Sequence, residues 1–449
     1  MSYPAHAKAI SLLGLPLIGG HIGQVAIGVT DTVMLGWYGV DSLAAGTLGS
    51  SYFFLFFLAG AGFAWAVMPI VASANASDDV TSMRRAARMG VWLSAVFGIV
   101  ALPAMLFSYP VLIATGQEPG IAADAALYLT VAGWGLFPAL GVMVLKSYLA
   151  ALERTQIVFW ITIVGAIANG LSNYMLIFGN WGAPEMGIVG AALASVITQT
   201  VMLIGVIIYV QRVLPEHQIF VRAWKPDWDM MGRVFRLGVP IGLTSVSEVG
   251  LFTASAFMMG WLGAVPLAAH GIALNLASIT FMVHLGLANV ATIRSGNAYG
   301  RNDIEDMKRG ARVVIVMSIA VALATIAAFL IWAEPLIAVF IQDNEPEREA
   351  IVQIGIVLLA LAALFQLVDG AQAVALGLLR GVQDTLVPAA LAAVAYWGVG
   401  IPASYALGFI LNWEGVGVWL GLVLGLAFAS VLLMGRFWLK SVPNLSKPT

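Results

Sequence analysis

The chain of 449 residues contains no cysteine and very little charge. Without cysteine it can form no disulfide, use no thiol nucleophile and offer no thiolate to a metal. Only 10% of its residues are charged, whereas 61% are hydrophobic. A soluble domain of this composition would expose more apolar surface than water solvates well. The balance therefore excludes a soluble globular protein and indicates an integral membrane protein.

Sequence motifs of nucleotide-driven and hydrolytic chemistry are also missing. The sequence has no Walker loop, no dinucleotide fingerprint and no nucleophile elbow. His270 and His284 are not spaced as metal ligands are, and we interpret them as core or interface residues. We therefore expect neither an enzyme nor an ATP-driven pump, and we expect no cofactor and no nucleic-acid partner.

Long apolar runs are what the chain has instead. Runs of about 20 residues or more, the length that crosses a bilayer as a helix, recur from end to end. We predict an all-α integral membrane protein with twelve transmembrane helices. Their predicted limits are 8–37, 48–75, 87–108, 121–150, 157–179, 185–212, 236–262, 268–294, 310–332, 350–379, 386–410 and 414–436.

The basic residues predict the orientation of these helices. If the N-terminus lies inside and the loops alternate, Arg348 is the one residue among 21 Lys and Arg that falls outside. Such an excess of positive charge marks the cytoplasmic face. We therefore predict a multi-pass membrane protein with both termini in the cytoplasm. The first apolar stretch is interpreted as a retained helix rather than a cleaved signal peptide.

The two halves of the chain repeat each other. The segment 13–16 matches the segment 237–240 at an offset of 224, and the basic run 83–88 matches 307–312 at the same offset. Repeats of equal orientation are related in transporters by an axis along the membrane normal. We predict two six-helix lobes, 1–212 and 236–449, related by such a pseudo-two-fold axis and joined by a cytoplasmic linker, 213–235. The alternative is a duplicated bundle that serves stability alone.

Three acidic residues, Asp31, Glu248 and Asp369, lie inside predicted spans. A carboxylate in hydrocarbon is costly, so such residues usually face the protein interior and mark ion or substrate paths. Glu248 and Asp369 fall in the same predicted lobe, and two neighbouring carboxylates stay ionised only with a cation or a shared proton. Oxygen ligands suit Na⁺ or H⁺ rather than a soft metal. We expect this pair to bind the coupling ion, with Na⁺ preferred over H⁺.

Polar side chains accompany the acids at membrane depth. Asn169 and Asn173 are four residues apart, so both amides lie on one helical face, where they could join Asp31. Asn275 is a further candidate in the other predicted lobe. For these asparagines, and less so for the acids, hydrogen bonding between helices is the alternative interpretation. The 18 Met and the many aromatic residues fit an adaptable cavity for organic cations, but lipid-facing helices use the same residues.

Over its whole length the chain resembles the multidrug and toxic compound extrusion (MATE) family. The resemblance rests on the segments 29–36, 268–275 and 379–385. Glu248 and Asp369 together are similar to the NorM branch, whose matching acids form a cation site in the C-terminal lobe. Asn173 stands where another branch has an Asp, which weakens the case for a purely N-terminal proton site. The resemblance implies a central V-shaped cleft and export of organic cation drugs or toxic metabolites, driven by inward Na⁺ or H⁺.

Two other classes of membrane protein stay open at this point. A flippase for a lipid-linked saccharide, from a related two-lobe fold, would line its cleft with cationic residues for a phosphate-bearing cargo. Here Lys and Arg are nearly absent from the helix centres. A channel or receptor would show no ion-dependent uphill flux. We expect a monomer surrounded by membrane lipid.

Overall fold

The structure is a computed structural model that describes residues 1–445, so Lys447, one of the predicted cytoplasmic basic residues, lies outside it. Within this range every regular element is a helix, and twelve helical stretches are long and apolar enough to cross a membrane. The twelve predicted helices are confirmed. The stretches are Tyr3–Tyr38, Val40–Asn75, Val80–Leu106, Pro119–Ala151, Thr155–Phe178, Gly187–Val213, Trp228–Leu262, Ala264–Gly300, Ile304–Ile331, Arg348–Gly381, Leu386–Ile410 and Glu414–Ser441.

The chain forms two compact units. Unit 1 contains Met1–Ile18 and Leu243–Thr449, and unit 2 contains Gly19–Gly242. Two long helices, α1 (Tyr3–Tyr38) and α9 (Trp228–Leu262), each contribute one part to either unit. Unit 2 further contains α2 (Val40–Asn75), α3 (Val80–Leu106), α4 (Ser108–Ala114), α5 (Pro119–Ala132), η1 (Gly133–Gly135), α6 (Leu136–Ala151), α7 (Thr155–Phe178), η2 (Asn180–Gly182), α8 (Gly187–Val213) and η3 (Pro215–His217).

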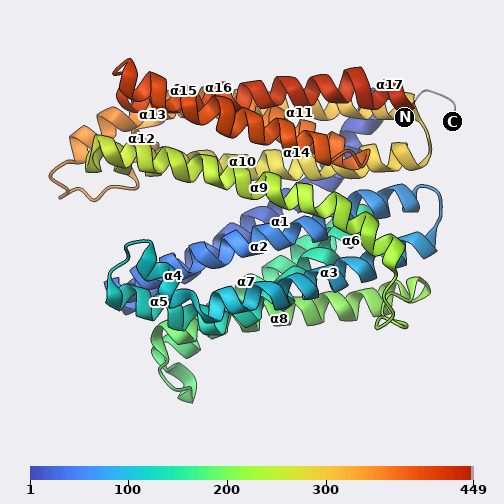
Figure 1. The fold of residues 1–449 in the computed structure, drawn as a ribbon, viewed down its shortest axis with the longest axis horizontal. Coiled ribbons are helices and arrows are strands. Elements are labelled where there is room, and N and C mark those ends of the chain that lie inside the picture. The colour runs from blue at the N-terminus through green and yellow to red at the C-terminus, as the bar shows by residue number, and fades with distance from the viewer. Residues whose placement is uncertain (446–449) are drawn as a thin grey trace. The chain divides into compact units, whose positions relative to one another are not determined.

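Unit 1 is built in the same way from the second half of the chain. Its start and its end lie together, because the N-terminus and α17 are found at the same end of the unit (Figure 1). Its further helices are α10 (Ala264–Gly300), α11 (Ile304–Ile331), α12 (Ala333–Ala338), α13 (Arg348–Gly381), α14 (Leu386–Ala393), η4 (Val394–Gly400), α15 (Ile401–Tyr405), η5 (Ala406–Ile410), α16 (Glu414–Arg436), η6 (Phe437–Ser441) and α17 (Val442–Leu445).

The boundaries of the two units differ from those of the lobes predicted from the repeat. The first helix of each repeat begins in the unit that is formed by the other half of the chain. Glycines permit this packing. A Cβ atom on Gly62 of α2 would lie 2.8 Å from Gly242 Cα of α9, and one on Gly286 of α10 would lie 3.3 Å from the Ile18 nitrogen of α1. Only glycine allows backbones to approach so closely. Gly62 and Gly286 are equivalent positions of the repeat, so the same contact is made twice.

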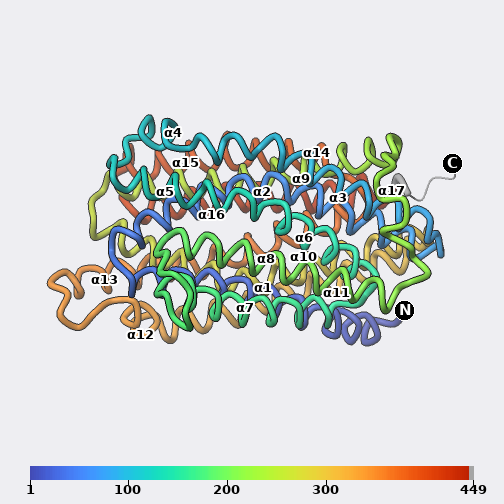
Figure 2. The backbone as a smooth tube through the Cα atoms, turned by 90° about the horizontal axis from the view of Figure 1, so that it is seen from below, coloured from blue at the N-terminus to red at the C-terminus, as the bar shows by residue number. Residues whose placement is uncertain are grey.

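The segment 214–227, part of the predicted linker, is fastened to unit 2. Trp92 of α3 donates to the Ala223 carbonyl at 2.7 Å, and Arg88 donates to the Gln218 carbonyl at 2.6 Å. Arg85 makes a two-pronged ion pair with Asp227, one arm of which is 3.0 Å long. The segment lies at the end of unit 2 opposite to α4 (Figure 2). It is therefore an ordered strap that leads into α9.

Candidate functional site

One face of α13 carries three buried polar side chains in the middle of an apolar helix. Gln366, Asp369 and Gln372 are three residues apart, which places them on one side of the helix, and they are 0%, 3% and 1% exposed. Gly370 follows the acid and has no side chain, so the ring of His284 on α10 can lie against the backbone there. A Cβ atom at this position would come within 2.6 Å of the ring. Close packing of α10 on α13 thus holds the acid in the interior of unit 1.

Glu248 of α9 meets this face. The Gln372 amide donates to Glu248 Oε1 at 3.2 Å, and the carboxylates of Glu248 and Asp369 are close enough to interact electrostatically. Glu248 is half-buried, whereas Asp369 is buried. The structure therefore brings together the two acids that were predicted as a pair. Because both lie within membrane-spanning helices, little solvent is at hand to screen their mutual repulsion.

Oxygen atoms without a hydrogen-bond partner occur on the pair and on two neighbouring residues. In residues 1–445, Asp369 Oδ1, Gln372 Oε1 and the Tyr396 hydroxyl are buried and have no hydrogen-bond partner. Buried polar atoms are nearly always partnered, so such a group calls for a reason. A hard cation such as Na⁺ takes carboxylate, amide and hydroxyl oxygens as ligands. The donor set fits an alkali cation, and no group of three or more His, Cys, Asp or Glu in the described chain could hold a transition metal.

Tyr396 and Arg380 were not predicted as site residues. Tyr396 lies in the π-helix η4, fully buried and within electrostatic range of both acids. The neighbouring Trp397 donates to Ser247 at 2.8 Å and so fixes η4 beside Glu248. Arg380 lies on α13 eleven residues after Asp369, hence on the same face, and its charge acts on Glu248. The helical spacing from Asp369 could have revealed Arg380 as a site residue. It could not reveal Tyr396, because the π-turn shifts the register of the helix there.

The second predicted cluster forms in unit 2. Asn169 and Asn173 of α7 both donate to Asp31 Oδ1, at 2.8 and 2.6 Å, and Asn173 also donates to Asn169 Oδ1 at 3.3 Å. Both asparagines are fully buried. Ser195 and Tyr128 lie near Asp31 as well, and neither was predicted. The spacing of four residues on α7 was thus enough to predict the amides, but not the contributions of α5 and α8.

Asn275 does not join the pair in unit 1. Its side chain is exposed, and its amide donates to the Gly271 carbonyl one turn earlier on the same helix, at 2.9 Å. An amide that bonds its own helix is satisfied without a tertiary partner. Its position at membrane depth is as predicted, but its side chain does not contribute an oxygen to Glu248 or Asp369 in this structure.

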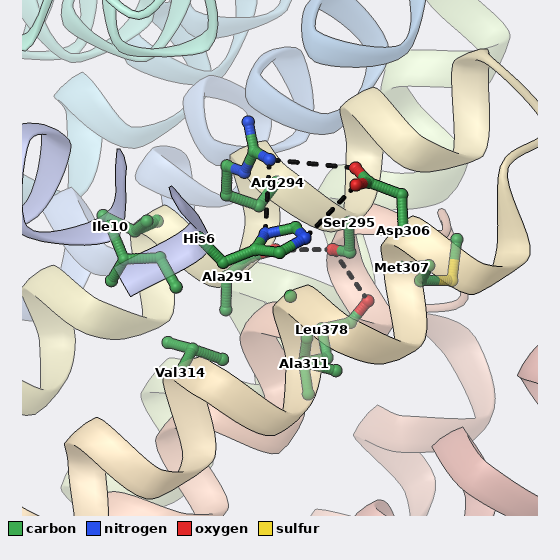
Figure 3. A pocket seen from close by; sticks show the side chains of 12 residues that line it. His6, Ile10, Ala291, Arg294, Ser295, Asp306, Met307, Ala311, Val314 and Leu378 are labelled. Carbon is green, nitrogen blue, oxygen red and sulfur yellow. Dashed lines mark hydrogen bonds and ion pairs between the residues drawn. The ribbon is translucent and has the colours of Figure 1, made fainter. Parts of the chain in front are cut away.

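A separate cavity of about 260 Å³, including space open to solvent, lies between the start of α1, the end of α10 and the start of α11 (Figure 3). Asp306 is its centre, with His6 at 3.2 Å, Arg294 at 3.8 Å and Arg301 at 3.0 Å. Asp306 is 5% exposed and has several positive groups around it. The cavity therefore belongs to an ionic clasp that holds the start of α1 in unit 1, and none of the predicted site residues lines it.

Comparisons with known proteins show what the whole chain is similar to. The family model described as MatE matches residues 16–175 and 240–406, two segments whose starts are separated by the offset of the internal repeat. Relatives from Rhizobium meliloti and Agrobacterium fabrum, each named "Probable multidrug resistance protein NorM", are 42% identical to this chain, over 97% of it and 94% of each relative. The crystal structure of the eukaryotic MATE transporter AtDTX14 is similar with a TM-score of 0.88 at 18% identity, covering 99% of this chain and 98% of that one.

Proposed function

Because the chain belongs to the MatE family of membrane transporters, which are not enzymes, we propose that it exports organic cations in exchange for inward Na⁺ or H⁺. The names of its relatives, which are multidrug resistance proteins, support drugs as cargo. The observation that carries the coupling is the pair Glu248 and Asp369, enclosed by oxygen atoms that lack donors. We place the protein in a bacterial inner membrane, as a monomer with both termini in the cytoplasm.

Na⁺ is the preferred coupling ion, because the site offers more oxygen than a proton needs. A shared proton would satisfy the repulsion between the two carboxylates. It would leave Gln372 Oε1 and the Tyr396 hydroxyl without a role, although both are buried and unpartnered in the described chain. A cation bound by all four groups uses each of them. Glu248 and Asp369 would hold the ion by charge, and Gln372 would hold it by its amide oxygen.

Ion binding drives transport only if the ion prefers one conformation over another, since a ligand shifts an equilibrium only through differential affinity. One charge moving down a potential of 100 mV supplies about 2.3 kcal/mol, which biases a cycle by roughly 50-fold. Asp31 forms a second switch in unit 2. Its Oδ1 accepts two amide hydrogen bonds and Ser195 also hydrogen-bonds the carboxylate, which we propose takes up a proton or the cationic group of the cargo.

Transport into vesicles tests the proposal. We expect a fluorescent organic cation to move uphill in everted vesicles under an imposed Na⁺ gradient, and Glu248→Gln with Asp369→Asn to abolish that movement without loss of folded protein. Asp343→Asn, at a fully exposed side chain, is the matched control and should transport normally. Full Na⁺-driven efflux by the double variant would sink the assignment of the pair.

The same vesicles separate the alternatives. A pH gradient applied alone distinguishes H⁺ from Na⁺ coupling, because each gradient can be imposed without the other. A channel would pass the dye only downhill under both gradients. A flippase would leave the dye where it is and move a lipid-linked saccharide instead, a result that would overturn the drug-export proposal.

A further inference from the structure

Four buried residues of unit 1 have polar atoms that the protein does not satisfy. They are His270 with both ring nitrogens, Trp419 with its indole N–H, Gln366 with its amide oxygen and Asp369 with Oδ1. None is more than 3% exposed. Leaving such a group unpaired costs about 1–3 kcal/mol, and native interiors pair nearly all of them. Four such residues at neighbouring positions of one unit, within the described part of the chain, therefore indicate an occupant.

These residues follow one another along the seam of three helices. The rings of His270 on α10 and Trp419 on α16 are 5.6 Å apart, and Trp419 is 5.9 Å from the ring of Phe365 on α13. Gln366 comes next on α13 and donates to the Ala277 carbonyl of α10 at 3.0 Å. Asp369 lies one turn further, about 4.5 Å along the helix axis. The four residues thus form a row across α10, α16 and α13.

The row leads from one end of unit 1 toward the acid pair. His270 lies six residues after the start of α10 at Ala264, and Trp419 lies five residues after the start of α16. Ala277 is seven residues after His270, about 10 Å deeper along α10. Gln366, which contacts it, is therefore deeper than the two rings, and Asp369 follows. By the predicted topology the Ala264 end faces the outside of the cell.

The chemistry of the row identifies its occupant. The indole N–H of Trp419 only donates, the Gln366 and Asp369 oxygens accept, and a neutral imidazole does one with each nitrogen. A metal cation cannot accept from an N–H group, whereas water both donates and accepts. Buried water typically makes about three hydrogen bonds to polar atoms that would otherwise lack partners. We propose that a line of bound water molecules fills this row and connects the Ala264 end of α10 with Asp369.

This water gives the acid pair contact with solvent through unit 1 itself. An ion that binds at Asp369 must shed hydration water and regain it on leaving, and the row offers a place for that water next to the site. The existence of the water follows from the unpartnered atoms alone. Its role in ion access rests on the proposed coupling at Glu248 and Asp369.

X-ray radiolytic footprinting of the full-length protein in lipid nanodiscs tests for this water directly. Bound water next to a side chain yields hydroxyl radicals in place, so a buried residue is oxidised only where water touches it. We expect Trp419 to be oxidised several-fold faster than Met105, a reactive and fully buried side chain in an apolar cluster of unit 2. Oxidation of Trp419 as slow as that of Met105 would mean that the row is dry, and would overturn the proposal.

Variants separate the water from the transport function. Gln366→Leu removes an acceptor at similar volume and should slow the oxidation of Trp419 several-fold, while the exposed Trp261 serves as the unchanged internal reference. Trp419→Phe removes the donor and keeps the aromatic packing against Phe365. If the water serves ion access, both variants slow Na⁺-driven efflux several-fold and leave the equilibrium affinity for Na⁺ unchanged. If efflux by the wild-type protein showed no dependence on Na⁺, the proposed function would be contradicted. The footprinting evidence for bound water would not be affected by that result.

Discussion

At the scale of the residue, amide neighbours make the acid sites of the two units different. Asp31 receives two amide hydrogen bonds on one oxygen, so its negative charge is stabilised by the protein. Glu248 receives one amide, and Asp369 Oδ1 receives none. Hydrogen bonds to a charged group contribute about 1.5–3 kcal/mol each. The pair in unit 1 therefore depends on added positive charge more than Asp31 does.

Gln372 presents two polar atoms beside the acid pair. Its amide nitrogen donates to Glu248, and its amide oxygen has no hydrogen-bond partner. We expect Gln372→Leu to weaken Na⁺ binding by about tenfold or more, the effect of losing one hydrogen bond to a charged group. Isothermal titration of purified protein with NaCl measures the affinity. Asn275→Ala is the matched control, because that amide bonds only its own helix. Equal losses in both variants would contradict a specific role for Gln372.

At the scale of the element, the strap formed by residues 214–227 stands out, because a polar connection between long helices is here bound along its length. His217 of the strap meets Tyr148 of α6, and burial lowers the pKa of this histidine. The Arg85 guanidinium, by its hydrogen bond, holds the pKa of Asp227 below its ordinary value. These contacts fix the start of α9 against α3.

The ion pair of Asp227 predicts a dependence of stability on pH. Because its pKa is lower in the folded protein, the stabilisation is present above the unfolded value of about 3.9 and is lost as the pH falls through the folded value. The pair is partly exposed, so its contribution is at most about 1 kcal/mol. We expect the thermal midpoint of Asp227→Asn to be lower than that of wild type near pH 7, and this difference to shrink as the pH falls below about 3.9.

Asp229→Asn provides the control for this pH series, because Asp229 is an exposed aspartate two residues after Asp227. Thermal unfolding in detergent, followed by intrinsic fluorescence, measures the midpoints. A constant difference between Asp227→Asn and wild type at all pH values would show that the ion pair does not contribute through its charge.

The strap also contains contacts that could not be predicted from the sequence. Apolar runs predicted all twelve spans, because burial in lipid demands length and hydrophobicity that a sequence displays directly. The i, i+4 spacing of Asn169 and Asn173 predicted their meeting with Asp31. The bonds from Arg88 and Trp92 to strap carbonyls could not be predicted, because backbone acceptors carry no residue signature. Tyr396 was missed for a related reason. The π-turn that sets the direction of its side chain arises from tertiary packing, which has no signature in the sequence.

At the scale of the whole molecule, the chain passes between its two units within continuous helices. The passages lie after Ile18 in α1 and after Gly242 in α9. These positions are equivalent in the repeat, and each follows a proline, Pro16 or Pro240, by two residues. A proline in a helix interior removes a backbone hydrogen bond and favours a kink. Bending is therefore easiest beside the two passages, where the proposed transport cycle would require it.

Replacing these prolines by alanine restores the missing backbone donor and favours a straight helix, by up to about 3 kcal/mol in helix propensity. We expect Pro16→Ala and Pro240→Ala each to slow single-turnover efflux several-fold, and the double variant to be slower still, with the affinity for Na⁺ unchanged. Pro69→Ala is the matched control, because Pro69 lies inside α2, which belongs to unit 2 alone. If Pro69→Ala slows efflux as much, a general effect of proline removal accounts for the result. If neither Pro16→Ala nor Pro240→Ala changes the rate, the bends at the two passages do not limit transport.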